Sequence, residues 1–259
     1  MRALLTSLML PVLFSCNGDG SGKMNLYTIE DDIELGRQLR DDIASDPETY
    51  PVLSETQYAE AYAHLYEIRD TILASGAVTH ADDFDWELRI IHDDETLNAF
   101  CAPGGYIYVY TGLIKFLSHE DNLAGVLGHE IAHADLRHST QQLTQAFGVG
   151  VLFAILTDSD PGLISQITEA LLNLSFSRSD EREADEASVD YLCGTSYAAD
   201  GTAGFFEQME GFELPQFLST HPSSDTRVED IIEYATTLEC DLTLNPDANY
   251  QALIDALPE

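Results

Sequence analysis

The stretch His129-Glu130-Ile131-Ala132-His133 decides how this chain is interpreted. In a helix, positions i and i+4 lie one turn apart on the same face, so both imidazoles can bind one metal ion. Glu130 lies between them and is free to take a proton from a metal-bound water. Apolar residues surround the pair: Leu123, Val126, Leu127, Ile131 and Ala134. They predict a buried helix whose histidines need partners, which favours a zinc hydrolase over an amphipathic helix with two exposed histidines.

A third metal ligand is expected downstream, because catalytic zinc takes three protein ligands and keeps one position for water. Metzincins use a histidine six residues after the second one, but that position is Ser139 here. The stretch from Ser177 to Asp185 supplies acids for the role instead. A glutamate on a second helix is the arrangement of thermolysin-type enzymes.

The pattern S-R-x-x-E-x-x-A-D after H-E-x-x-H resembles the HtpX and CAAX-prenyl-endopeptidase family of gluzincin metallopeptidases. Further matches extend the resemblance over most of residues 26–235: Asn98 to Phe100 with Pro103 to Val109, Leu123 to Gly128, Arg137-His138, and His221 to Arg227. The length, the N-terminus and the absence of an apolar stretch of spanning length after it resemble the soluble lipoprotein branch. Cys101 departs from the family pattern, which usually has no thiol there.

The resemblance implies that His129, His133 and Glu181 bind one Zn²⁺ per chain, with Glu130 as the catalytic base. Asp185, one turn after Glu181, would orient a ligand histidine. His221 has three readings: it stabilises the oxyanion, it binds zinc in a closed resting state, or it braces the loop. Arg227 would anchor an acidic residue of the helix.

Two other residues near the motifs compete for ligand roles. Glu183 is an alternative to Glu181, but a shift of two residues on a helix turns its side chain away. His138 could be a fourth ligand; it lies five residues after His133 and off its face, so a structural hydrogen-bonded histidine is the preferred reading.

The substrate is expected to add as a strand to the edge formed by Tyr106 to Tyr110, by resemblance to the family's active-site strand. The residues expected to contact it are Asn98, Gly105, Tyr106, Ile107 and Tyr108. Such binding through main-chain hydrogen bonds suits an extended or misfolded protein.

Periodicity and breakers predict an α+β fold that is mainly helical, with a small sheet beside the zinc helix. Helices are expected over residues 29–44, 54–74, 112–117, 120–139, 140–156, 161–174, 177–193, 202–208 and 225–238. Strands are expected over residues 86–91 and 106–110, with a short extended piece at 98–101.

The N-terminus predicts a lipoprotein. Arg2 and the apolar run Ala3 to Phe14 resemble a signal peptide, and Leu13-Phe14-Ser15-Cys16 resembles a lipobox with lipid on Cys16. The alternative is a plain secretory signal. The predicted organisation is a signal peptide at 1–15, a tether at 16–25 and one peptidase domain at 26–259. Asn17 after the cysteine resembles the sorting signal for the outer membrane, with the domain facing the periplasm.

Composition limits the partners. The chain has 46 acidic and 11 basic residues, a formal net charge of −35. Such a surface repels nucleic acid, which is excluded as a partner. The acids are spread along the chain, so the preferred explanation of the negative charge is a halophilic or marine source. The alternative explanation is a surface that attracts cationic substrates.

Four cysteines are present, and an envelope location permits disulfides. With lipid on Cys16, the expected pair is Cys193 with Cys240, because each ends a predicted helix. Cys101 lies in the predicted active-site segment and should stay reduced. The alternative is three free buried thiols.

Together these features predict a lipid-anchored zinc endopeptidase of the cell envelope, acting in protein quality control on protein or peptide substrates. A chaperone-like assembly factor with minor or self-inhibited proteolysis is the alternative. An amidase is a third reading, disfavoured by the strand beside the site.

Overall fold

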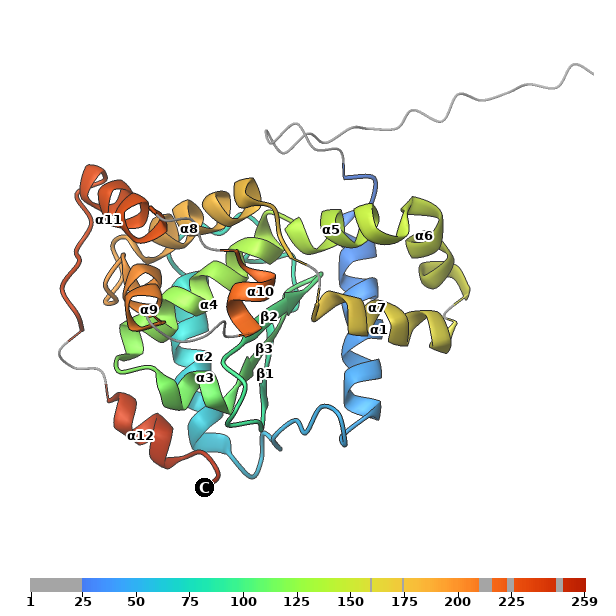
Figure 1. The fold of residues 1–259 in the computed structure, drawn as a ribbon, viewed down its shortest axis with the longest axis horizontal. Helices are drawn as coiled ribbons and strands as arrows, with labels where there is room; N and C mark the ends of the chain where they lie inside the picture. The colour runs from blue at the N-terminus through green and yellow to red at the C-terminus, as the bar shows by residue number, and fades with distance from the viewer. Residues whose placement is uncertain (1–24, 159, 174, 210–215, 223–225, 246–248) are drawn as a thin grey trace, which may run out of the picture.

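The computed structural model describes residues 25–158, 160–173, 175–209, 216–222, 226–245 and 249–259. The predicted signal peptide, Cys16 and almost all of the predicted tether lie outside these residues. The described part is mainly helical with a small three-stranded sheet, as the sequence predicted (Figure 1). No described helix is both long and apolar enough to cross a bilayer.

The elements in chain order are α1 (Ile29–Ser45), α2 (Ala59–Leu73), β1 (Glu87–Ile91), β2 (Ala99–Ala102), β3 (Tyr106–Tyr110), α3 (Thr111–Phe116), α4 (Glu120–Asp135), α5 (His138–Phe147), α6 (Val149–Asp158), α7 (Pro161–Leu171), α8 (Arg178–Leu192), α9 (Gly201–Met209), α10 (Gln216–Thr220), α11 (Arg227–Thr237) and α12 (Tyr250–Asp255).

The sheet corrects the expected position of the strand Tyr106–Tyr110. Its order is β1-β3-β2, with β1 parallel and β2 antiparallel to β3. The strand β3 is therefore central, and its main-chain groups already pair on both sides. The edge strand that contacts α4 is β2, which the sequence indicated only as a short extended piece. A substrate strand can add only to an edge, so β2 replaces β3 as the candidate docking strand.

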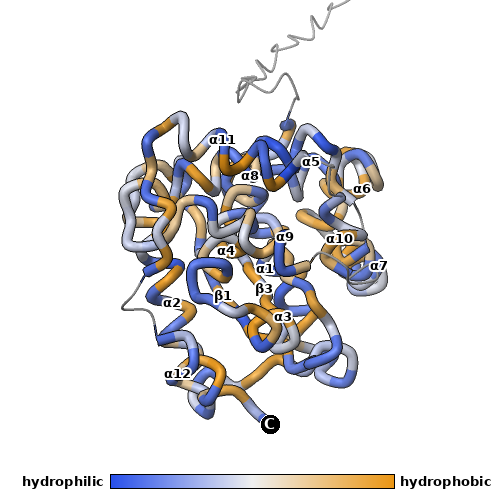
Figure 2. The backbone as a smooth tube through the Cα atoms, turned by 60° about the vertical axis from the view of Figure 1, so that its left-hand side comes forward, coloured by the Kyte–Doolittle hydropathy of each residue, from blue (hydrophilic) through white to orange (hydrophobic). Residues whose placement is uncertain are grey.

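The sheet separates two hydrophobic clusters, because successive side chains of a strand point to opposite faces. One face carries Leu88, Ile107 and Val109 into the main core, which includes α2, α4, α8 and α9. The other carries Tyr106 and Tyr108 into a second cluster with α1 and α5 to α7. Figure 2 shows apolar segments along the strands and alternating apolar and polar segments along peripheral helices such as α11.

The helix α4 is shorter than the predicted Glu120 to Ser139. It ends at Asp135, and Arg137 adopts a left-handed conformation with φ 60°. The Arg137 side chain donates to Asp32 at 2.6 Å and to the carbonyl oxygen of Tyr27 at 2.7 Å. These bonds to the start of α1 hold the break, which brings His138 back against His133.

Close backbone contacts fix α4 in the core. A Cβ atom at Gly125 would overlap the backbone of Gly201 and Thr202 at the start of α9. A Cβ atom at Gly128 would lie 2.6 Å from Oγ of Ser188 in α8. The two glycines therefore let both helices approach the metal-binding helix.

A disulfide joins Cys193 at the end of α8 to Cys240 beyond α11. This is the pair that the sequence indicated, and Cys101 is buried with a free thiol. Burial raises the pKa of Cys101 well above its usual value, so this thiol is a poor nucleophile.

Candidate metal centre

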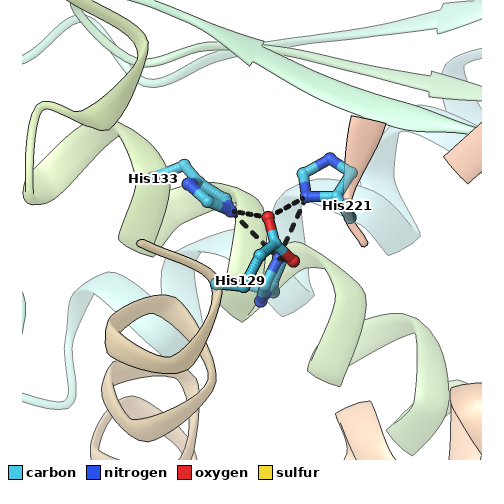
Figure 3. A group of neighbouring side chains, drawn as sticks. His129, His133 and His221 are labelled. Carbon is cyan, nitrogen blue, oxygen red and sulfur yellow. Dashed lines mark hydrogen bonds and ion pairs between the residues drawn. The ribbon is translucent and has the colours of Figure 1, made fainter. Parts of the chain in front are cut away.

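Four side chains from three parts of the chain meet in one buried group. His129 and His133 come from α4, Glu181 from the first turns of α8, and His221 from the residue after α10. One ligand atom of each lies within 4.8 Å of the others, and all four are at most 2% exposed. Figure 3 shows the three imidazoles pointing toward one another.

The separations fit a metal ion. His129 Nε2 lies 3.0 Å from His133 Nε2 and 3.2 Å from His221 Nδ1. Glu181 Oε1 lies 3.4 Å from His133 Nε2 and 3.0 Å from His221 Nδ1. Ligand atoms about 2.0–2.1 Å from a tetrahedral zinc ion are roughly 3.3–3.4 Å apart, so the donor set has nearly the size that zinc requires.

The outer nitrogen of His129 is held by Asp185. Its Nδ1 lies 2.9 Å from Asp185 Oδ1, a contact that leaves Nε2 toward the group. Arg227 in turn donates to both oxygens of Asp185, at 2.6 and 2.7 Å, and lies 2.7 Å from Glu181 Oε2. Arg227 thus neutralises two buried acids.

His133 is held by residues that the sequence did not assign to it. Its Nδ1 lies 3.1 Å from Nδ1 of His138, and the ring of Phe176 stacks on it with centroids 3.8 Å apart. His138 Nε2 lies 3.4 Å from Oε2 of Glu183. Glu183 is therefore turned away from the four-residue group, as its helical position predicted. The sequence indicated that His138 is a structural hydrogen-bonded histidine but did not identify its partner, and no motif spacing indicated Phe176.

Glu130 is completely buried beside the group. His221 Nε2 lies 3.4 Å from its Oε1, and neither carboxylate oxygen has a hydrogen bond of regular geometry within the described residues. Burial raises the pKa of Glu130 to about 7, against a smaller lowering by His129. A carboxyl group with a pKa near neutrality can both take and return a proton.

The same burial acts differently on the neighbours. It lowers the pKa of His133 well below its usual value, which keeps the imidazole neutral as a metal ligand must be. Burial also raises the pKa of Glu181, but the charge of His221 and the hydrogen bond from His133 outweigh it and hold the pKa well below the usual range. The group therefore favours a neutral histidine and an ionised carboxylate.

The predicted substrate residues do not gather as expected. Tyr106 donates its hydroxyl hydrogen to Asp85 and Tyr108 lies in the second hydrophobic cluster, so neither side chain faces the metal group. Ile107 lies in the main core, and a Cβ on Gly105 would meet Trp86 at 2.9 Å. These residues do not lie on an edge that a substrate strand could join, because β3 is the central strand of the sheet. Asn98, just before β2, is completely buried, and its side-chain nitrogen and oxygen lack partners among the described residues.

Comparisons with known proteins agree with this geometry. The sequence profile of Peptidase family M48 matches residues 61–235. The mitochondrial metalloendopeptidase OMA1 of Schizosaccharomyces pombe is 35% identical over 167 residues, covering 61% of this chain and 49% of OMA1. Metalloprotease YcaL of Escherichia coli is 30% identical over 146 residues, covering 52% and 57%. The beta-barrel assembly-enhancing protease of Yersinia pestis is 30% identical over 159 residues, covering 54% and 32%. The chain thus spans about half of OMA1 and only part of the other two.

Proposed function

Because the chain belongs to peptidase family M48, we propose that it is a zinc-dependent endopeptidase whose metal ligands are His129, His133 and Glu181. The observation that carries this is the buried donor set of nearly tetrahedral size beside the buried carboxyl group of Glu130. Bound zinc would supply Lewis acidity and lower the pKa of the attacking water toward about 7.

Glu130 performs the proton transfers in this proposal. Its pKa of about 7 lets it take the proton of the attacking water and deliver that proton to the leaving amine nitrogen. Asp185 holds the His129 ring, and His138 with Phe176 holds the His133 ring, so both ligands stay oriented during the reaction.

The substrate binds along the outer edge of β2 in this proposal, where it would replace the hydrogen bond that Ser139 Oγ now donates to the carbonyl oxygen of Cys101 at 2.8 Å. Main-chain hydrogen bonds at that edge select an extended backbone with little demand on sequence, which suits misfolded or unfolded proteins. The side-chain amide of Asn98, which has no hydrogen-bond partner within the described part of the chain, lies at the start of the edge and can hydrogen-bond the peptide. Phe217 of α10 already donates its backbone N–H to the carbonyl oxygen of Leu97, at 3.2 Å, so α10 partly covers this approach.

Metal analysis with casein digestion tests the activity. The wild type should hold one zinc and digest casein, and Glu130→Gln should keep the zinc and lose about 10²–10⁴-fold in rate. The amide has nearly the shape of the carboxyl group, so folding should be preserved. Activity of Glu130→Gln within a few-fold of the wild type would contradict the proposed base.

His221 decides between an open and a self-inhibited enzyme. As a fourth ligand it would occupy the position that catalytic zinc keeps for water. Its place in the group favours the second candidate, an assembly factor with self-inhibited proteolysis. His221→Ala separates the roles: faster casein digestion would indicate a closing ligand, and slower digestion with unchanged zinc content would indicate a group that stabilises the oxyanion.

The location rests on the N-terminal sequence. Lipid on Cys16 would anchor the chain to an envelope membrane, facing the periplasm, as the soluble lipoprotein branch of this family does by resemblance. Mass spectrometry of the protein from the membrane fraction should find acyl mass on Cys16. A mature chain that starts at any other residue would exclude the lipid anchor.

A further inference from the structure

A second group of metal-ligand side chains lies next to the first. His138, Asp180 and Glu183 each offer one donor atom, and these atoms lie within 4.8 Å of one another. His138 Nε2 is 3.4 Å from Glu183 Oε2 and 3.9 Å from Asp180 Oδ1. A ring nitrogen with two carboxylate oxygens at these separations is a donor set for zinc or a similar divalent ion.

Each carboxylate is held by a serine through its other oxygen. Ser177 donates to Asp180 Oδ2 from its backbone N–H at 3.1 Å and from its hydroxyl at 2.7 Å. Ser179 donates to Glu183 Oε1 at 3.0 Å. The bonds between Ser177 and Asp180 form the capping box that begins α8. With the bond from Ser179 they leave one oxygen of each acid directed at His138.

The group is open to solvent, unlike the first. The side chain of Glu183 is 32% exposed and that of Asp180 is 12% exposed, whereas His138 is buried at 1%. An ion can therefore enter from the Glu183 side and keep water ligands there. The exposure to water makes this group the weaker of the two.

We propose that His138, Asp180 and Glu183 form a second, lower-affinity site for a divalent metal ion such as Zn²⁺, and that its occupation opposes metal binding at His129, His133 and Glu181. The inhibition of activity that follows rests on the proposed peptidase function. The binding itself does not.

The opposition follows from the hydrogen positions on two imidazoles. A metal on His133 Nε2 leaves the proton of the neutral ring on Nδ1, which donates to His138 Nδ1 at 3.1 Å. His138 then carries its own proton on Nε2 and donates it toward Glu183. A metal on His138 Nε2 moves that proton to Nδ1, and two N–H groups then face each other.

The two sites therefore bind metal with negative coupling. Coupling free energies between sites correspond to roughly 5–150-fold in affinity, and the effect is the same in both directions. Low zinc would fill the catalytic group first and activate the protein. Excess zinc would fill the second site and weaken the orientation of His133, so activity would fall again.

Zinc titration of the metal-stripped full chain tests this, with metal counted by equilibrium dialysis and activity followed with casein. The wild type should bind a second, weaker equivalent, and its activity should peak at one equivalent and then fall as the second equivalent binds. Glu183→Gln should bind one equivalent and keep its activity in excess zinc. The control Glu186→Gln lies on the same helix, has an exposed side chain and should behave like the wild type.

Equal second binding by Glu183→Gln and the wild type would overturn the site, as would a single equivalent in the wild type at millimolar zinc. A second equivalent that leaves the activity unchanged would overturn the coupling. If the wild type digests no casein at any zinc level, the proposed peptidase function fails, and the metal count alone still decides whether the second site exists.

Discussion

The helices α4 and α8 both carry residues of the metal group, but they are built differently. Every residue of α4 is buried, whereas α8 buries one face and exposes the other. On α4, the ligands and Glu130 therefore have only protein neighbours or a metal to satisfy them. On α8, acids that face the metal group alternate along the helix with acids that face solvent. The difference shows that α4 supplies two histidine ligands in a rigid environment without water. The effect of each acid on α8 depends on the face of the helix that carries it.

Removing the ligand on the buried face of α8 should give the largest effect. Glu181→Gln removes the anionic donor and leaves the buried Arg227 with one acid fewer. Zinc affinity should fall on the order of 100-fold or more, since the loss of residues that merely orient ligands already costs 10–100-fold. Metal content after dialysis measures this, and full occupancy in the variant would remove Glu181 from the ligand set.

The disulfide tests whether α8 also needs covalent support. Cys193 and Cys240 are 47 residues apart in sequence. Replacing both with serine should lower the free energy of unfolding by about 2–4 kcal/mol, mainly through the larger freedom of the unfolded chain. Denaturant unfolding of the double variant measures the change. An unchanged midpoint would show that packing of α8 against α4 is sufficient.

The acids of the two helices should respond oppositely to pH in metal-stripped protein. The pKa of Glu130 is raised to about 7, so the stability associated with its proton is lost as the pH rises from about 4.5 to about 7, on the order of 3 kcal/mol. The pKa of Glu181 is lowered, so its contribution is present above the unfolded pKa and lost at lower pH. The free energy of unfolding should fall across this range in the wild type, and Glu130→Gln should lack the part of the fall that Glu130 causes. Parallel curves for the two proteins would contradict the raised pKa of Glu130.

Substitution by alanine should separate the two helices at the smallest scale. Gly125→Ala in α4 would overlap the backbone of α9 and should cost about 1–3 kcal/mol. Glu186→Ala on the exposed face of α8 should stay within about 0.5 kcal/mol. Thermal unfolding compares them, and an equal loss in both would mean that burial does not distinguish the helices.

The sequence predicted the parts of the site that depend on local spacing. His129 and His133 share one face of α4 because of helical periodicity, and the family resemblance indicated Glu181 and Asp185, which the structure places beside them. The sequence did not predict the order of the strands. The lengths of the segments that connect β1, β2 and β3 do not indicate which strands pair.

The left-handed turn at Arg137 was also missed. An arginine in that conformation is held by partners from α1, which are distant in sequence. The consequence is that the contact of His138 with His133 could not be derived from helical periodicity, which continued the helix through this point.

Among the described residues, the segment that carries His221 is held by hydrogen bonds and by the buried ring of Phe217, which stacks on His221. Phe176 donates its backbone N–H to the carbonyl oxygen of Thr220 at 2.9 Å, and His221 Nδ1 lies 3.0 Å from Glu181. One neutral hydrogen bond contributes about 0.5–1.5 kcal/mol and one to a charged group about 1.5–3 kcal/mol. Together these two bonds would leave a withdrawn form populated at no more than about a few per cent, and the burial of Phe217 lowers that population further. The resting protein would then digest unfolded chains slowly without any activating partner, and a peptide that pairs with β2 would raise the population of the form that binds it.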